Sequence, residues 1–277
     1  MRPASSRGDV NGTPVDHDGP ELAWRETGHG PVVVFLHGLG GSRTAWDPQL
    51  ADLGRHFRCV AWDLPGYGRS RPLPRLTFPA IADAVARLLD ELGVERAHLV
   101  GESFGGMHAL HTALRHPQRV DRLVLTNTSP AFGLDGTRPE EWKRARLAPL
   151  DAGTTPADLA PGVLAAIAGP RLVGPALEAR VAAFARIPAE ALRAAVDCLP
   201  HHDVRSQLAA ITAPALVIAG QLDTETPVDY ARVLARGLAD ARLEVLDGIG
   251  HLAASEDPQR FNRLVERFLH DTEGPPH

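Results

Sequence analysis

Short runs of mostly apolar residues recur along the chain, and each ends at or just before a turn-forming glycine, proline, asparagine or aspartate. They occupy residues 32–36, 58–64, 97–101, 122–126, 215–219 and 242–246. Continuous apolar runs of this length are typical of strands that are buried on both faces of a sheet. The pattern therefore predicts a central sheet with strands inside the core.

Helical spacing of apolar residues appears between these runs, at residues 42–54, 77–92, 105–116, 227–238 and 257–270. In the second of these segments, Ile81, Val85, Leu88 and Leu92 recur every three or four positions. Strands that alternate with helices pair in parallel and are covered on both faces. We therefore expect an α/β fold with a mostly parallel central sheet.

The N-terminal segment, residues 1–20, is polar and scattered with glycine, proline and aspartate. We expect a loose tail that leads into an edge strand around residues 10–15, with residues 21–26 pairing as a second strand. The α/β core is then expected to consist of residues 21–130 and 206–277.

The alternation breaks between residues 131 and 205, where no strand pattern occurs. This segment has helical stretches rich in alanine and leucine, interrupted by prolines from Pro139 to Pro200. Ligands of open α/β sheets bind at the carboxyl ends of the strands. We therefore expect an inserted helical cap, or lid, over that edge of the sheet.

Composition excludes several functional classes. A chain of 277 residues that is 44% hydrophobic and 23% charged is typical of one large globular domain. A formal charge of -5 provides no basic surface for nucleic acid. Cys59 and Cys198 lie far apart and match no metal or redox spacing. With no secretory leader or long apolar run, we expect a cytoplasmic monomer or homodimer that acts on a small molecule, away from membranes.

The nucleophile is predicted in the sequence Gly101-Glu102-Ser103-Phe104-Gly105, a G-x-S-x-G pattern between a predicted strand and a predicted helix. A serine on such a sharp turn is exposed at the sheet edge, and the glycines leave room for the turn. The start of the helix favours developing negative charge. We therefore assign Ser103 as the candidate nucleophile.

A serine hydroxyl needs a base, and the base needs a carboxylate to orient it. Among thirteen histidines, His251 follows Gly248 and Gly250 in the loop after the last strand. Asp223 follows the preceding strand, so both lie at the same sheet edge as Ser103. The order Ser, Asp, His fits this architecture. Competing carboxylates close to Asp223 or to the histidine loop are Glu225, Asp229 and Asp247.

The anionic intermediate needs N–H donors, which we assign to the backbones of Phe104 and Leu39. His37 is expected to brace the Leu39 loop. This chemistry needs no metal or organic cofactor. Residues expected to line the substrate pocket are His37, Gly38, Trp46, Phe132 and Trp142, although core packing explains the aromatic residues about as well.

Together these motifs resemble the α/β-hydrolase family over nearly the whole chain, including the loop at residues 63–70 and the residues that follow His251. The sequence His37-Gly38-Leu39-Gly40-Gly41, with Trp46 and a short helical cap, is most similar to small-molecule esterases, enol-lactonases and carbon–carbon bond hydrolases. Relatives that open epoxides or remove halogen carry aspartate where this chain has Ser103. Glu102 is interpreted as packing support.

Three functions remain open. The first is hydrolysis of a carboxylic ester or lactone. The second is hydrolysis of a carbon–carbon bond in a vinylogous diketone, for which Arg171, Arg180 or Arg186 would hold the acidic substrate, unless these arginines are only solvated surface residues. The third is ligand binding without catalysis, against which the complete Ser, Asp and His set argues.

Overall fold

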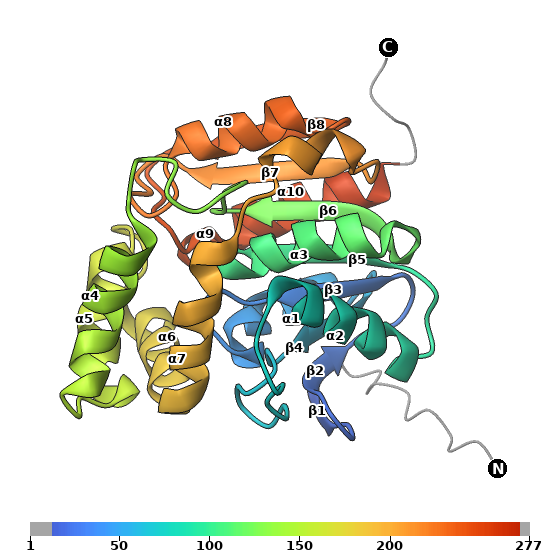
Figure 1. The fold of residues 1–277 in the computed structure, drawn as a ribbon. Helices are drawn as coiled ribbons and strands as arrows, with labels where there is room; N and C mark the ends of the chain where they lie inside the picture. Colours follow the sequence, from blue (N-terminus) through green and yellow to red (C-terminus); the bar gives the residue numbers. More distant parts are fainter. Residues whose placement is uncertain (1–12, 272–277) are drawn as a thin grey trace.

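The computed structural model describes residues 13–271 and contains one eight-stranded sheet (Figure 1). The strand order is β1-β2-β4-β3-β5-β6-β7-β8. The strands are β1 Val15–Asp18, β2 Ala23–Thr27, β3 Val32–Leu36, β4 Arg58–Trp62, β5 Ala97–Glu102, β6 Val120–Thr126, β7 Ala215–Gly220 and β8 Ala241–Leu246. From β4 to β8 all neighbours pair in parallel. The predicted mostly parallel sheet is thus confirmed.

The N-terminal edge differs in position from the expectation. β1 pairs antiparallel with β2, and Val15 lies opposite Glu26. The expected edge strand is thus part of the sheet, but it occupies residues 15–18 and not residues 10–15. The apolar pattern does not mark this strand, because its side chains are mostly polar and little of its surface is buried. The expected tail up to residue 12, and the last six residues of the expected core, lie outside the described residues.

The pleat of the central strands divides the core into two layers. In β3, Val34 and Leu36 belong to one apolar cluster, whereas Val33 and Phe35 belong to the other. The first face is covered by α2 Phe78–Glu91, α3 Phe104–Arg115 and α8 Val228–Gly237. The second is covered by α1 Asp47–Leu53, α9 Ala253–Glu256 and α10 Pro258–His270. The predicted helix at 42–54 is divided into a 3₁₀ turn, Arg43–Trp46, and α1.

Four helices lie between β6 and β7: α4 Pro139–Asp151, α5 Pro156–Ile167, α6 Gly174–Ala185 and α7 Ala189–Cys198. Figure 1 shows them together to one side of the sheet. The chain leaves and returns through adjacent segments, because Phe132 N–H donates to the His202 carbonyl at 2.8 Å and Val204 N–H donates to the Pro130 carbonyl at 2.9 Å. We call these four helices and their connections the helical insertion. No helix among the described residues is long and apolar enough to cross a membrane.

Helix α3 approaches the sheet very closely where it begins. A Cβ atom on Gly105 would collide with the carbonyl oxygen of Leu36 in β3, so backbone meets backbone at this point. Only glycine permits that approach without moving the helix or the strand.

Gly105→Ala is expected to lower the free energy of unfolding by at least about 2 kcal/mol, because neither backbone can move without disturbing the core. Gly162→Ala is the matched control. Gly162 lies within α5, where an added Cβ meets no atom within 4 Å, so alanine should stabilise by about 0.5–1 kcal/mol through helix propensity. Urea unfolding followed by circular dichroism measures both. Equal stabilities for the two variants would contradict the packing argument.

Candidate active site

Ser103 lies in a left-handed backbone conformation between β5 and α3. Its φ is 55° and its ψ is -120°, and its N–H donates to the Thr126 carbonyl at 3.0 Å. A non-glycine residue in this region is strained and persists only where its surroundings hold it. Here the adjacent strand β6 and the close packing of α3 hold the turn. The strain directs the Ser103 hydroxyl away from the sheet, toward the loops at its carboxyl edge.

His251 follows β8, which is separated from β5 by β6 and β7, and its loop reaches back to Ser103. Its Nε2 atom lies 3.0 Å from the Ser103 Oγ atom. On the other side of the ring, Nδ1 lies 3.0 and 2.9 Å from the two carboxylate oxygens of Asp223. A proton on Nδ1 is then held by Asp223, which leaves Nε2 free to accept from Ser103. Ser103, His251 and Asp223 therefore form a continuous hydrogen-bonded chain.

Asp223 is the carboxylate that contacts the His251 ring in the described part of the chain. Asp229 lies in α8 and Asp247 lies in the turn after β8. Glu225 faces the cavity described below, where it pairs with an arginine. The position of Asp223 directly after β7 is what separates it from these competitors.

Three further residues hold the Asp223 carboxylate, and the sequence did not single out two of them, Asn127 and Thr226. The third, Glu225, donates its N–H to Oδ1 at 2.9 Å. Asn127 Nδ2 donates to Asp223 Oδ2 at 2.9 Å and to the Gly250 carbonyl at 3.0 Å. Thr226 donates its hydroxyl to Oδ2 at 2.7 Å and its N–H to Oδ1 at 3.0 Å. Asn127 adopts a φ of 47° directly after β6. This position could have identified Asn127 from the sequence, because site residues of such a sheet lie at the carboxyl ends of its strands.

These contacts shift the titration of both partners. Burial alone lowers the pKa of His251, but the negative charge of Asp223 and its hydrogen bond to the ring outweigh burial and raise that pKa above 6.5. Burial raises the pKa of Asp223, but the charge of His251 and the hydrogen bonds from His251 and Asn127 hold it well below its usual range. Asp223 is therefore ionised at neutral pH.

The loop after β3 brings Leu39 and Gly38 next to the serine. A Cβ atom on Gly38 would lie 3.2 Å from that of Ser103. The Tyr67 hydroxyl donates to the Leu39 carbonyl at 2.9 Å. Within residues 13–271, the backbone N–H groups of Leu39 and Phe104 donate to no protein acceptor. Both are therefore available to a negatively charged oxygen beside Ser103.

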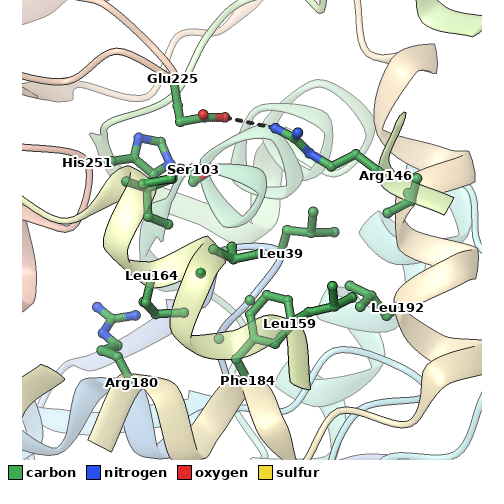
Figure 2. A pocket seen from close by; sticks show the side chains of 18 of the residues that line it. Leu39, Ser103, Arg146, Leu159, Leu164, Arg180, Phe184, Leu192, Glu225 and His251 are labelled. Carbon is green, nitrogen blue, oxygen red and sulfur yellow. Dashed lines mark hydrogen bonds and ion pairs between the residues drawn. The ribbon is translucent and has the colours of Figure 1, made fainter. Parts of the chain in front are cut away.

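A cavity of about 520 Å³ opens in front of Ser103 and His251, between the sheet edge and the helical insertion. Its wall is mostly apolar, and Figure 2 shows several of these side chains around the space. They include Leu39, Leu159, Leu164, Phe184 and Leu192. All but Leu39 come from the insertion, which therefore supplies most of the apolar wall.

Two of the expected pocket residues, Gly38 and Trp142, line this cavity, and three do not. His37 is buried at 1% exposure, with Nδ1 at 2.8 Å from the Gly38 carbonyl and Nε2 accepting from Leu64 N–H at 3.0 Å. It braces the loop instead. Trp46 is fully buried against Phe35, because the 3₁₀ turn directs its indole into the core.

Phe132 packs edge to face on the ring of Trp142, with ring centroids 5.4 Å apart. Trp142 is the ring that reaches the cavity, and Phe132 supports it from outside the wall. The sequence predicted that aromatic residues occur in this region, but it did not show which of the two packed rings faces the cavity.

Both arginines on the cavity wall have a carboxylate partner. Arg180 in α6 donates to the Glu102 carboxylate at 3.0 Å, and both side chains are at least 94% buried. Arg146 in α4 lies 3.5 Å from Glu225, as the dashed line in Figure 2 marks. Arg180 is therefore not a solvated surface residue, and Glu102 carries an ion pair in addition to any packing role.

One cluster in residues 13–271 has the ligand types and spacing that a metal ion needs. His56, Glu266 and His270 place one ligand atom each within 4.8 Å of one another. They lie in the turn after α1 and on α10, and none of them lines the cavity beside Ser103.

Known proteins share this fold and much of this sequence. Residues 31–258 match the family model described as alpha/beta hydrolase fold. A proposed carbamate hydrolase, RutD of Variovorax paradoxus, is 37% identical over 87% of this chain and 94% of its own length. A hydrolase from Pseudomonas aeruginosa superposes with a TM-score of 0.83 at 34% identity, covering 94% and 99% of the two chains.

An enol-lactonase from Burkholderia xenovorans superposes with a TM-score of 0.80 at 27% identity, covering 93% of this chain and 100% of that one. The chain therefore belongs to the α/β-hydrolase fold family, as its motifs indicated. The matched residues, 31–258, include the helical insertion and the three loops that carry Ser103, Asp223 and His251.

Replacing Asp223 with asparagine should lower the pKa of His251. The largest of the charges that raise that pKa is then gone, while the burial that lowers it remains. NMR titration of ¹³C-labelled histidine measures this directly, with His251→Gln identifying the resonance. Because the wild-type pKa is raised, protonated His251 stabilises the fold at low pH, and this contribution is lost as pH rises through the raised pKa. An unchanged pKa in the variant would refute the pairing.

Proposed function

We propose that this protein hydrolyses a carboxylic ester or lactone through an acyl-enzyme on Ser103. The observation that carries the proposal is the chain of hydrogen bonds from Asp223 through His251 to Ser103, with contacts of 2.9 and 3.0 Å. This chain ends at a cavity large enough for a small-molecule substrate.

In the first half of the reaction, Ser103 Oγ attacks the carbonyl carbon while His251 Nε2 takes the hydroxyl proton. The carbonyl oxygen becomes an anion, which the N–H groups of Leu39 and Phe104 stabilise. The C–O bond to the alcohol portion then breaks, and His251 returns its proton to the leaving alkoxide. Asp223 stabilises the imidazolium throughout and remains ionised.

In the second half, water replaces the alcohol. His251 takes a proton from that water as its oxygen attacks the acyl carbon, and the same two N–H groups stabilise the second anion. When the bond to Ser103 breaks, His251 returns the proton to Oγ, and the carboxylic acid is released. A lactone follows the same steps with its alcohol still attached to the acyl chain.

The wall of the cavity supports an uncharged substrate with an apolar acyl group. The insertion lines it with leucine, valine and phenylalanine side chains, and its arginines, Arg180 and Arg146, have carboxylate partners. A charged ligand group at Arg180 would have to break a buried ion pair and leave the Glu102 charge unpaired. An apolar chain gains from burial at no such cost.

Carbon–carbon bond hydrolysis remains the alternative, and the same pairs weigh against it. That reaction needs a free cation for an acidic substrate, whereas Arg180 already binds Glu102 and Arg171 binds Asp257 at 2.9 Å. The third candidate, Arg186, is exposed and does not line the cavity. Carbamate hydrolysis, the activity in the name of the Variovorax paradoxus relative, uses the same acyl transfer. Carbamates therefore belong in the substrate panel.

A hydrolysis screen tests the proposal. It uses p-nitrophenyl esters from acetate to decanoate, lactones of increasing ring size, aryl carbamates and a ring-fission dienoate. We expect turnover of uncharged esters or lactones, and loss of at least about a thousandfold in kcat/KM for a folded Ser103→Ala variant. Cleavage of the dienoate alone would establish the alternative. Full activity without the Ser103 hydroxyl, or no labelling of Ser103 by a fluorophosphonate, would refute the mechanism.

The acid limb of the pH–rate profile should depend on Glu225. Its negative charge is among those that raise the pKa of His251, and the base must be neutral to act. Activity should therefore rise with pH through that raised pKa, and Glu225→Gln should move the limb to lower pH. Glu178→Gln, on the exposed side of α6, is the control and should leave the limb in place. An unmoved limb in Glu225→Gln would contradict the assignment.

A further inference from the structure

Three consecutive residues beside the histidine loop contact the helical insertion. Ser255 Oγ accepts from Arg180 Nε at 2.7 Å, Glu256 accepts from Gly169 N–H at 3.1 Å, and the Asp257 carboxylate accepts from Arg171 at 2.9 Å. These three residues lie at the end of α9, only four to six positions after His251. The insertion is therefore attached to the turn that immediately follows the candidate base.

Glu256 is the central residue of this turn, and the residue is only 6% exposed. Oε2 accepts from Gly250 N–H at 2.8 Å, and Oε1 accepts from Leu252 N–H at 3.1 Å. Oε1 also accepts from Gly169 N–H in the insertion. A buried carboxylate needs such donors to offset its desolvation. Two of its three donors are the residues on either side of His251.

The same region joins the two backbones directly. His251 N–H donates to the carbonyl of Ile167, the last residue of α5, at 3.2 Å. A Cβ atom on Gly250 would lie only 2.5 Å from the nitrogen of Gly169, so a side chain there would separate the two segments. Ile167 also lines the cavity. The substrate wall and the backbone of the candidate base are thus in contact.

We propose that Glu256 is a positioning residue for His251, acting through the backbone on both sides of that histidine and linking its position to the docked insertion. The proposal rests on the proposed function, in which His251 is the base. Asp223 holds the imidazole at Nδ1, but it does not hold the backbone from which the ring projects. Displacement of a catalytic group by about 1 Å can cost on the order of a hundredfold in rate. A fixed backbone is therefore as necessary as a fixed ring.

The test uses two variants of the full-length protein, with p-nitrophenyl butyrate as the substrate probe and a fluorophosphonate as the label. Glu256→Gln keeps the size of the side chain, but it replaces one acceptor oxygen with an N–H₂ group that faces N–H donors. Glu256→Asp keeps the charge and withdraws the carboxylate by one methylene. If one variant fails to fold, the other still supplies the measurement.

For a folded variant, we expect kcat to fall by about tenfold to a hundredfold while KM changes by less than about twofold. Labelling of Ser103 should slow by a similar factor, and the acid limb should stay in place because Asp223 still sets the pKa of His251. Glu178→Gln, an exposed carboxylate in the insertion, is the matched control and should retain wild-type rates.

A purely structural role for Glu256 would give another result. Tm would fall, but kcat and the labelling rate, measured well below Tm, would stay within about twofold of wild type. That outcome overturns the positioning role and leaves the proposed function intact. Wild-type protein that neither cleaves esters nor labels at Ser103 would refute the proposed function, and the positioning role with it.

Discussion

The carboxylate of Asp223 is buried, and a buried charge is stable only where hydrogen bonds replace the water it has lost. Its donors come from three different strand ends: Asn127 after β6, Thr226 in its own loop after β7, and His251 after β8. Satisfying this one charge therefore brings three loops together at the carboxyl edge of the sheet. The distance between His251 and Ser103 follows from that convergence, because the strained turn after β5 places the serine hydroxyl at the same edge.

A second buried carboxylate has a complementary effect. Glu256 receives backbone N–H groups from both sides of His251 and from the insertion. Asp223 acts on the imidazole ring, whereas Glu256 acts on the main chain that carries it. Both charges are met by donors that the fold fixes in advance, so little reorganisation accompanies the binding of a substrate. The buried pair of Glu102 and Arg180 extends this arrangement from the insertion to the residue before Ser103.

The sequence predicted the sheet, because apolar runs separated by helical segments leave few other arrangements. The sequence also predicted that Ser103, Asp223 and His251 lie at one edge of the sheet, since parallel strands end on the same side. It could not orient individual side chains: Trp46 turns into the core at a 3₁₀ turn, and Phe132 lies behind Trp142. Pairs such as Glu102 and Arg180 are 78 positions apart, and no local pattern links them.

The core and the insertion contribute different parts of the candidate site, but the two contributions are not fully independent. The loops of the core carry Ser103, His251 and Asp223, while most of the apolar cavity wall comes from α4 to α7. Changes in Leu159 or Leu192 would alter the space for an acyl group without touching the hydrogen-bonded chain. Ile167, Gly169 and Arg180 differ, because they contact the turns around His251 and Ser103 directly. Substitutions there would alter the contacts of these turns together with the shape of the pocket, which restricts how the insertion can vary while His251 and Ser103 stay in place.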